Sequence, residues 1–290
     1  MTTIINSKNT NFIKNFENNV KNTIYKFNLL GNKDKILVAV SGGKDSTTVL
    51  YVLNKLGYPV EAITINALIG NYSKHNLENI KTFCKEQHIK LHEISFRKEF
   101  GYSLCYIRSV LQSKGIHLKS CTLCGVLKRY LLNKYTRKLK ATKLVTGHNL
   151  DDVAQSVLMN FFRNQLELSS RLGPITGLIK DKKFVARVKP LYLTTEKDVE
   201  IYSKLQNFPV KYGRCPCSSD AYRNSVRNLL NEYEQISPRT KKNIITWYLK
   251  VLPKIKDYFY TDESLRYCMK CGEPSKKDVC MACFIIEKLK

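Results

Sequence analysis

The sequence has no long apolar run and no signal-like N-terminus. No stretch approaches the roughly 18 apolar residues that a membrane-spanning helix needs, and the first residues lack the charged, apolar and small-residue regions of a secretory signal. Internal repeats and low-complexity linkers are also missing. We therefore expect a soluble cytoplasmic protein with no membrane partner. Its 290 residues, 43% of them hydrophobic, are enough for one α/β domain and a smaller appendage.

Acidic residues are scarce. There are 24 Asp and Glu against 49 Lys and Arg, a formal net charge of +25. A codon bias toward A and T could by itself enrich lysine. A protein this basic nevertheless attracts polyanions whatever the origin of its charge. The charge therefore favours a nucleic-acid partner.

Cysteine is absent before Cys84, and ten cysteines follow from there. Without a secretory signal, a disulfide framework is not expected, so these residues indicate metal or redox chemistry. Cys84 and Cys105 stand alone and are expected to be small buried apolar side chains. The other eight form close pairs: Cys121 with Cys124, Cys215 with Cys217, Cys268 with Cys271, and Cys280 with Cys283.

The apolar pattern predicts alternating helices and strands. Spacings of three and four predict a helix over residues 9–28. The continuous apolar run at 36–40 is typical of a strand buried on both faces of a parallel sheet. Further strands are expected at 60–65, 90–96, 142–147 and 184–191, with helices between them, and residues 219–258 are expected to be helical. This alternation predicts right-handed crossovers and a doubly wound parallel α/β sheet.

Residues 41–46, SGGKDS, directly follow the first expected strand and open a helix. The two glycines let the backbone approach a phosphate closely, and the helix N-terminus directs N–H donors and partial positive charge toward it. Ser41, Ser46 and Lys44 add hydroxyl donors and a charge. The spacing differs from a Walker A loop. A phosphate-binding loop is favoured over a simple glycine-rich turn.

A second polar segment, residues 146–164, begins where another expected strand ends. Gly147 and His148 should lie at the carboxyl edge of the sheet, where such sheets bind ligands. Asp151 and Asp152 then stand at a helix start, where carboxylates also act as caps. From position alone, at least one of the two is expected to be a cap.

Two C-x-x-C pairs separated by eight residues lie near the end of the chain. Each pair turns two thiolates toward one centre, so Cys268, Cys271, Cys280 and Cys283 predict a closed tetrahedral zinc site. Gly272 supplies the permissive backbone of the turn. A second redox site is the alternative. The closed set favours structural zinc, because a region this short has too little core to hold itself together.

The loop at 41–46 resembles the pyrophosphate-binding loop of the N-type ATP pyrophosphatases. Together with CTLCGVLKRYLLN (121–133), GHNLDDVAQ (147–155), RLGP (171–174) and CPCSSDAYRNSVR (215–227), it makes residues 10–285 similar to the tRNA 2-thiouridine synthetase family. The resemblance implies a Rossmann-like ATP pyrophosphatase fold. It also implies an activity: ATP adenylates the C2 oxygen of a tRNA uridine with release of pyrophosphate, and sulfur then replaces that oxygen with release of AMP.

The resemblance further implies a [4Fe–4S] cluster on Cys121, Cys124 and Cys215, whose fourth iron carries a sulfide that attacks C2. Three thiolates and one open position suit catalysis. Cys217 departs from the family pattern. It could close a four-thiolate site around zinc or the cluster, or be a neighbouring thiol that handles persulfide sulfur, although a C-x-C pair seldom gives both sulfurs tetrahedral geometry. A persulfide on one of the paired cysteines is the alternative route.

Other roles are also implied by resemblance. Asp45 would organise Mg²⁺ on the ATP phosphates, and Asp152 is preferred to Asp151 as a catalytic residue. Lys128, one helical turn after Cys124, would either stabilise the developing anion or be an ordinary lysine facing tRNA or solvent. The predicted ATP site comprises Ala39, Ser41, Gly42, Gly43, Lys44, Asp45, Ser46, Ile65, Gly147, His148 and Asp152. The predicted catalytic residues are Asp45, Lys128, Asp152, Cys121 and Cys215.

The implied partners are tRNA, with Arg223 and Arg227 contacting tRNA or nucleotide phosphates, and a sulfur donor. The donor is a ubiquitin-like thiocarboxylate protein, a persulfide carrier or free sulfide. A homodimer is expected by resemblance. Relatives commonly carry an N-terminal zinc finger, which the lack of cysteine before Cys84 excludes here, so docking of tRNA should depend on the C-terminal ribbon and the basic surface.

We divide the chain into an N-terminal helical segment (1–33), a catalytic domain (34–218), a tRNA-facing helical region (219–262) and a zinc ribbon (263–290). The wobble uridine is the preferred target. The alternatives are a T-loop uridine thiolase, a tRNA cytidine 2-thiolase and a non-catalytic zinc-ribbon protein that binds tRNA. The intact loop at 41–46 argues against the last.

Overall fold

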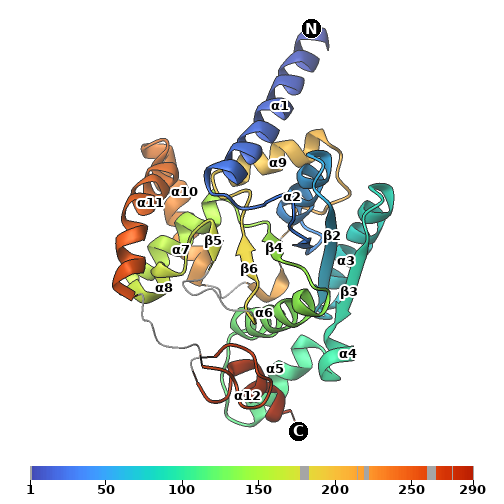
Figure 1. Cartoon of the computed structure of the whole chain (residues 1–290), viewed down its shortest axis with the longest axis vertical. Coiled ribbons are helices and arrows are strands. Elements are labelled where there is room, and N and C mark those ends of the chain that lie inside the picture. The colour runs from blue at the N-terminus through green and yellow to red at the C-terminus, as the bar shows by residue number, and fades with distance from the viewer. Residues whose placement is uncertain are drawn as a thin grey trace.

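A computed structural model describes residues 2–176, 183–213, 215–218, 222–259, 266–275 and 277–289. Its centre is a six-stranded sheet in the order β3-β2-β1-β4-β6-β5 (Figure 1). Four strand pairs are parallel, and only β5 runs antiparallel, against β6. The strands are β1 (Ile36–Ala39), β2 (Val60–Asn66), β3 (Leu91–Ser95), β4 (Lys143–Thr146), β5 (Ile175–Thr176) and β6 (Ala186–Val188).

Helices connect and cover these strands. They are α1 (Thr2–Lys26), α2 (Lys44–Lys55), α3 (Gly70–Glu86), α4 (Phe96–Phe100), α5 (Leu104–Ser113), α6 (Ser120–Lys138), α7 (Leu150–Phe162), α8 (Leu166–Ser170), α9 (Glu196–Leu205), the 3₁₀ turn η1 (Pro216–Ser218), α10 (Tyr222–Ile236), α11 (Thr240–Phe259) and α12 (Met281–Glu287). None of the described helices is both long and apolar enough to cross a membrane.

The predicted doubly wound parallel sheet is confirmed, with three differences in detail. Strand β6 covers only the middle of the expected 184–191 segment, because the chain turns after it, where the amide of Tyr192 bonds the carbonyl of Lys189 at 3.1 Å. The antiparallel β5 was not predicted, since two residues carry no detectable alternation. Helix α1 begins at Thr2, in a polar stretch that the apolar spacing did not mark.

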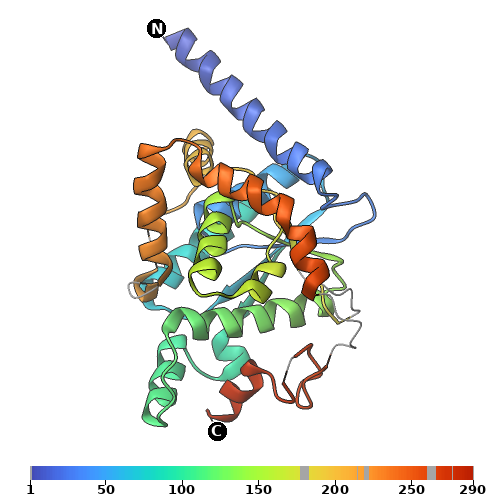
Figure 2. The same cartoon turned by 90° about the vertical axis from the view of Figure 1, so that its left-hand side faces the viewer.

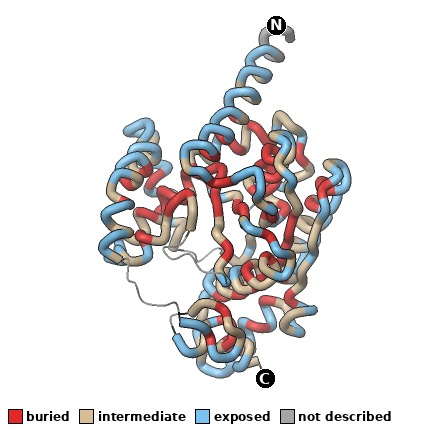
Figure 3. Tube along the Cα trace, viewed as in Figure 1, coloured by how far each residue is buried: buried red, intermediate tan, exposed pale blue. Residues whose placement is uncertain are grey.

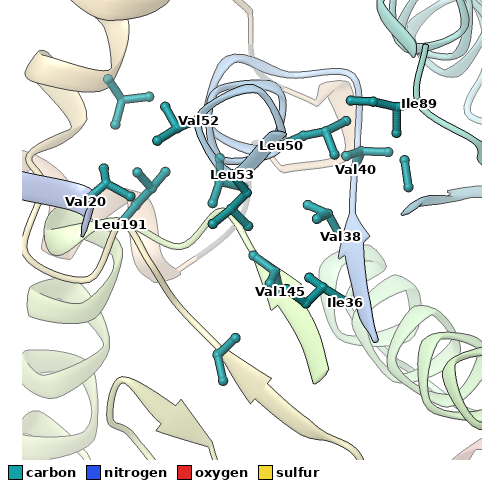
Figure 4. Packing of buried hydrophobic residues seen from close by; sticks show 14 of the residues in the cluster. Val20, Ile36, Val38, Val40, Leu50, Val52, Leu53, Ile89, Val145 and Leu191 are labelled. Carbon is teal, nitrogen blue, oxygen red and sulfur yellow. The ribbon is translucent and has the colours of Figure 1, made fainter. Parts of the chain in front are cut away.

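Neighbouring residues of β1 face opposite layers of the core. Ile36 and Val38 pack with Leu50 and Leu53 of α2 (Figure 4), whereas Leu37 belongs to the cluster on the other face, with α5 and α6. Because side chains alternate along a strand, a run buried on both faces must be apolar throughout. Figure 3 shows this buried material along the sheet and exposed residues around its rim.

The expected helical stretch 219–258 consists of α10 and α11. Both pack on α7 through a third apolar cluster that includes Val153, Leu230 and Tyr248. They therefore form one packed body with the helix that follows β4. The predicted boundaries at residue 219 and at 262–263 fall outside the described residues.

The two ends of the chain lie on different sides of the sheet. Helix α1 projects from the body (Figures 1 and 2) and is anchored where Phe16 stacks on Tyr202 with ring centroids 4.2 Å apart. The C-terminal segment packs against α6, and Ala282 and Ile285 of α12 are buried in the same cluster as Leu127. It thereby attaches to the helix that begins with the first cysteine pair.

Candidate active site

The loop between β1 and α2 is folded tightly on itself. The amide of Ser41 donates to the Ser46 hydroxyl at 3.0 Å, and that hydroxyl also bonds the Gly43 carbonyl at 3.2 Å. Gly42 has φ +79°, and a Cβ there would lie 2.1 Å from the carbonyl oxygen of Asn76. Both facts require glycine at this position. Contacts within the loop and its close approach to Asn76 of α3 thus fix the backbone at the N-terminus of α2.

The segment after β4 lies directly against this loop. A Cβ on Gly147 would be 2.8 Å from the backbone of Asp45 and Ser46, so glycine permits the close approach. Asn149 caps α7 by accepting from the amide of Asp152 at 3.1 Å, while its side-chain N–H₂ donates to Asp45 at 2.9 Å. The structure therefore joins two segments about one hundred residues apart.

Lys44 is held between two carboxylates. Its ammonium lies 3.0 Å from Asp45 and 2.9 Å from Glu196. Burial alone lowers the pKa of Lys44, but the two carboxylates outweigh it and raise that pKa above its ordinary value. Glu196 was not predicted from the sequence, because it starts a distant helix with no motif around it. This lysine stays charged and ready to bind an anion.

The two adjacent aspartates have different partners. Asp151 is buried, forms a 2.6 Å ion pair with Lys241 of α11 and accepts from the amide of Glu196 at 2.7 Å. Asp152 instead lies near Asp45, and its carboxylate is 3.7 Å from Arg223. Burial raises the pKa of both Asp45 and Asp152, and the charge of Asp152 adds to the rise at Asp45. Two partly buried carboxylates at one edge suit a divalent cation.

Basic residues surround this acidic pair. Arg223 donates to the backbone carbonyl of Asp152 and to the Ser156 hydroxyl, each at 3.2 Å. Lys189 is buried, which lowers its pKa to about 8, and it donates to the carbonyl of Gly173 at 2.8 Å. This contact gives the RLGP segment a structural role. Sequence reasoning missed Lys189, since an isolated lysine after a strand carries no local signal.

The remaining predicted ATP-site residues occupy the same edge of the sheet. Ala39 ends β1, and His148 follows β4 with its Nδ1 2.9 Å from the Thr146 hydroxyl. Arg227 lies one turn after Arg223 in α10, and its Nε is buried without a hydrogen-bond partner among the described residues. The ligand-binding roles of these residues stay predictions.

A cavity of about 290 Å³ opens beside the loop. Ser41 lines it from the loop side and Ile65 from the end of β2, whereas Lys128 lines it from α6. The four cysteines Cys121, Cys124, Cys215 and Cys217 also line it. One space therefore contains part of the phosphate loop and all four thiols of the first two cysteine pairs.

Helix α6 carries Cys121 and Cys124, η1 contains Cys217, and Cys215 lies directly before η1. Helix α6 begins at Ser120, so Cys121 and Cys124 lie in its first turns. The thiol of Cys121 donates to the backbone carbonyl of Cys217, in the 3₁₀ turn η1, at 3.5 Å. Lys128 follows Cys124 by one turn and faces the same cavity.

The two single cysteines differ from each other. Cys84 is buried as expected, and burial raises its pKa to about 11. Cys105 is exposed, which corrects the expectation of a buried side chain. It occupies the outward face of α5, next to the buried Leu104 that lines the cavity.

The C-terminal cysteines converge on one point. The sulfur atoms of Cys268, Cys271, Cys280 and Cys283 all lie within 4.8 Å of one another. The amide of Cys280 donates to the sulfur of Cys268 at 3.2 Å, and Gly272 has φ +68°. In the described ranges, no other set of three or more His, Cys, Asp or Glu brings its ligand atoms this close. The arrangement suits one tetrahedral ion.

Residues 8–234 match the PP-loop domain family. A tRNA-5-methyluridine(54) 2-sulfurtransferase of Pyrococcus horikoshii is 35% identical over 272 residues, covering 94% of this chain and 84% of that protein. The cytoplasmic tRNA 2-thiolation protein 1 of Caenorhabditis briggsae is 31% identical and covers 96% of this chain and 74% of that protein. The chain belongs to the PP-loop family of tRNA 2-thiolation sulfurtransferases.

The fold of this family member is also found in a solved relative. The structure of the U34-tRNA thiolase NcsA from Methanococcus maripaludis, which contains its [4Fe–4S] cluster, superposes with a TM-score of 0.79 at 29% identity. The match covers 96% of this chain and 88% of that one. The predicted family and ATP pyrophosphatase fold are therefore confirmed.

Proposed function

We propose that the protein is an ATP-dependent sulfurtransferase that 2-thiolates a tRNA uridine. The observation that carries the proposal is the shared cavity, in which Ser41 of the phosphate loop and four cysteine thiols face one space. Activation by ATP and delivery of sulfur must occur at the same carbon, so the two sets of groups have to meet. The tRNA substrate and the thiolation chemistry follow the names of the relatives.

The first half-reaction is adenylation. The uridine C2 oxygen attacks the α-phosphorus of ATP, and pyrophosphate leaves. Backbone amides of the loop and Lys44 bind the phosphates, because they combine donors, charge and the N-terminus of α2. Asp45 and Asp152 would hold Mg²⁺, and its positive charge would favour the ionised forms of both carboxylates, whose pKa values burial raises.

The second half-reaction puts sulfur on C2 and releases AMP. Cys121, Cys124 and Cys215 would hold a [4Fe–4S] cluster, because the start of α6 and the segment before η1 bring these three cysteines to one cavity. When bound, the cluster supplies a sulfur ligand at an iron that has no cysteine. Lys128 faces the same cavity and stabilises the negative charge that develops as C2 is attacked. Cys217 is proposed as an additional, non-ligating thiol beside this set.

The converging C-terminal cysteines are proposed to hold structural Zn²⁺. Four thiolates leave no open position, so the site suits stability rather than turnover. The predicted division at 34–218, 219–262 and 263–290 remains our proposal for the functional regions. We also propose a cytoplasmic location and a homodimer. The proposed sulfur donor is a ubiquitin-like thiocarboxylate protein, a persulfide carrier or sulfide.

The wobble uridine is the proposed target, in line with the thiolase whose structure is similar. A T-loop uridine is the second candidate, because the relative from Pyrococcus horikoshii is named for position 54. Two tRNA transcripts separate them, one with cytidine at position 34 and one with cytidine at position 54. Loss of 2-thiolation in only the first supports the wobble assignment, and loss in only the second supports the T-loop assignment.

The proposed function is tested with anaerobically purified protein, tRNA, ATP and sulfide. Mass spectrometry of digested tRNA should reveal a 2-thiolated uridine, and pyrophosphate should appear in step with it. Iron near four and zinc near one per chain support the metal assignment. A colourless protein that contains zinc alone and still thiolates tRNA would contradict the cluster. Absence of both pyrophosphate and thiolated nucleoside would contradict the function.

A further inference from the structure

An exposed pair of stacked aromatic rings stands at the start of α5. The rings of Tyr102 and Tyr106 have centroids 4.6 Å apart and an interplanar angle of 18°. Their exposed fractions are 37% and 51%. Large aromatic surfaces in water cost free energy, so an exposed stacked pair at a fixed position is a candidate binding surface.

The backbone fixes this pair relative to the cavity. Leu104, between the two tyrosines, is buried and lines the cavity, and its amide bonds the carbonyl of Ala67 at 3.0 Å. Ser103 caps the helix by accepting from the amide of Tyr106 at 3.3 Å. The tyrosines therefore stand beside the space that holds the thiols.

The charge around the pair fits a polyanion. Residues 100–150 contain no Asp or Glu and ten Lys or Arg, and Glu99 just before them pairs with one of these cations, Lys134. These residues include α5 and α6, which flank the cavity. Arg108 of α5 and Lys119 before α6 are exposed, and Lys128 faces the cavity itself. Cations of this kind bind phosphates, whereas the aromatic rings bind the faces of bases.

We propose that Tyr102 and Tyr106 form a stacking platform for an unpaired RNA base next to the uridine that enters the cavity. The inference rests on the proposed tRNA substrate and extends it to a named surface. A uridine can enter the cavity only if it leaves its stack, and its neighbour then needs a new stacking partner. The exposed rings provide that partner, and the surrounding cations hold the backbone.

The test uses an RNA hairpin with the fluorescent base 2-aminopurine beside the loop uridine. Wild-type protein and the variant Tyr102→Phe/Tyr106→Phe should both quench the probe, because the rings remain. Tyr102→Ala/Tyr106→Ala should not quench it, and its Kd for the hairpin should rise roughly tenfold. The control is Phe161→Ala/Phe162→Ala, an exposed aromatic pair at the end of α7, a helix from which no residue lines the cavity, and it should change neither signal.

Normal quenching and a normal Kd for the hairpin in the alanine variant would overturn the platform. The platform would also be overturned if the alanine variant bound RNA normally but lost affinity for a sulfur-carrier protein. Circular dichroism and Tm confirm that each variant is folded. A wild-type protein that thiolates no tRNA refutes the proposed function. A wild type that thiolates tRNA, with an unchanged KM for tRNA in the alanine variant, refutes the platform alone.

Discussion

The two groups of cysteines in this protein differ in how their sulfur atoms are held. At the C-terminus, four sulfurs lie within 4.8 Å of one another, and those of Cys268 and Cys280 accept backbone N–H hydrogen bonds. At the cavity, four cysteines from α6, from η1 and from the residue before η1 line a space shared with Ser41 and Lys128. The first group is closed around one point, whereas the second leaves room for a substrate. The two groups have the same number of cysteines, but their geometry favours different roles: a structural metal site for the first and a reactive site for the second.

The largest expected effect is the removal of a cavity thiol. Cys124→Ala should reduce tRNA thiolation by about three orders of magnitude or more, since the residue belongs to the group that supplies sulfur. Thiolated nucleoside is measured by mass spectrometry, and zinc content should stay unchanged. Cys105→Ser is the control, because that thiol is exposed outside the cavity. A Cys124→Ala variant with near-normal thiolation would remove the distinction between the two groups.

Removal of a C-terminal thiol should act on stability. Cys280→Ser should lose the bound zinc and lower the free energy of unfolding of the C-terminal module by at least about 3 kcal/mol, because that metal replaces a core. Zinc analysis and limited proteolysis followed by mass spectrometry measure the two effects. Release of pyrophosphate from ATP and tRNA should persist at low temperature. Intact zinc binding in this variant would contradict the closed four-thiolate site.

The neighbouring aspartates provide a matched pair of substitutions. Asp152→Asn should lower pyrophosphate release about 100-fold, since it removes a carboxylate proposed to hold Mg²⁺. The raised pKa of Asp152 means that its ionised form destabilises the fold and that protonation relieves this as pH falls. The variant should therefore have a higher Tm at pH 7 than the wild type, and the difference should shrink on acidification.

Asp151→Asn should instead lower the stability of the fold and have little effect on pyrophosphate release. It leaves Lys241 without its carboxylate where both side chains are largely buried, 14% and 8% exposed, so stability should fall by about 2–3 kcal/mol. Differential scanning calorimetry and a pyrophosphate assay on both variants measure the contrast. Equal losses of stability in the two would contradict the assignment of separate roles.

Local patterns predicted most of the parallel sheet and the metal-ligand spacing. The strand at 36–40 and the loop at 41–46 could be predicted because the residues that determine them are adjacent in the sequence. These are the continuous apolar run of the strand and the glycine pair of the loop. Contacts such as Lys44 with Glu196 could not be predicted, because they join residues about 150 positions apart and leave no periodicity. The prediction for Cys105 was wrong for a related reason. The residue type gives only the average burial of a cysteine, whereas the burial of Cys105 depends on which side of α5 it occupies.

The smallest expected effect tests whether the two cysteine groups are coupled through α6. Glu273 of the C-terminal module is buried and bonds Arg137 and Asn133 of that helix. Glu273→Gln should cost about 1 kcal/mol, because Arg137 is partly exposed and water replaces some of the interaction. Thiolation should stay within about twofold, since Cys121 lies more than four helical turns from Arg137.

Thermal unfolding of the zinc-loaded protein and hydrogen exchange in α12 measure the cost of Glu273→Gln. Glu287→Gln is its control in the same module, where the ion pair with Lys270 is exposed and should be worth at most about 0.5 kcal/mol. Because Glu273→Gln keeps all eight paired cysteines, any loss of thiolation in this variant would have to be transmitted through α6. A tenfold drop would therefore mean that the closed group positions the open one, and the two could no longer be treated as independent.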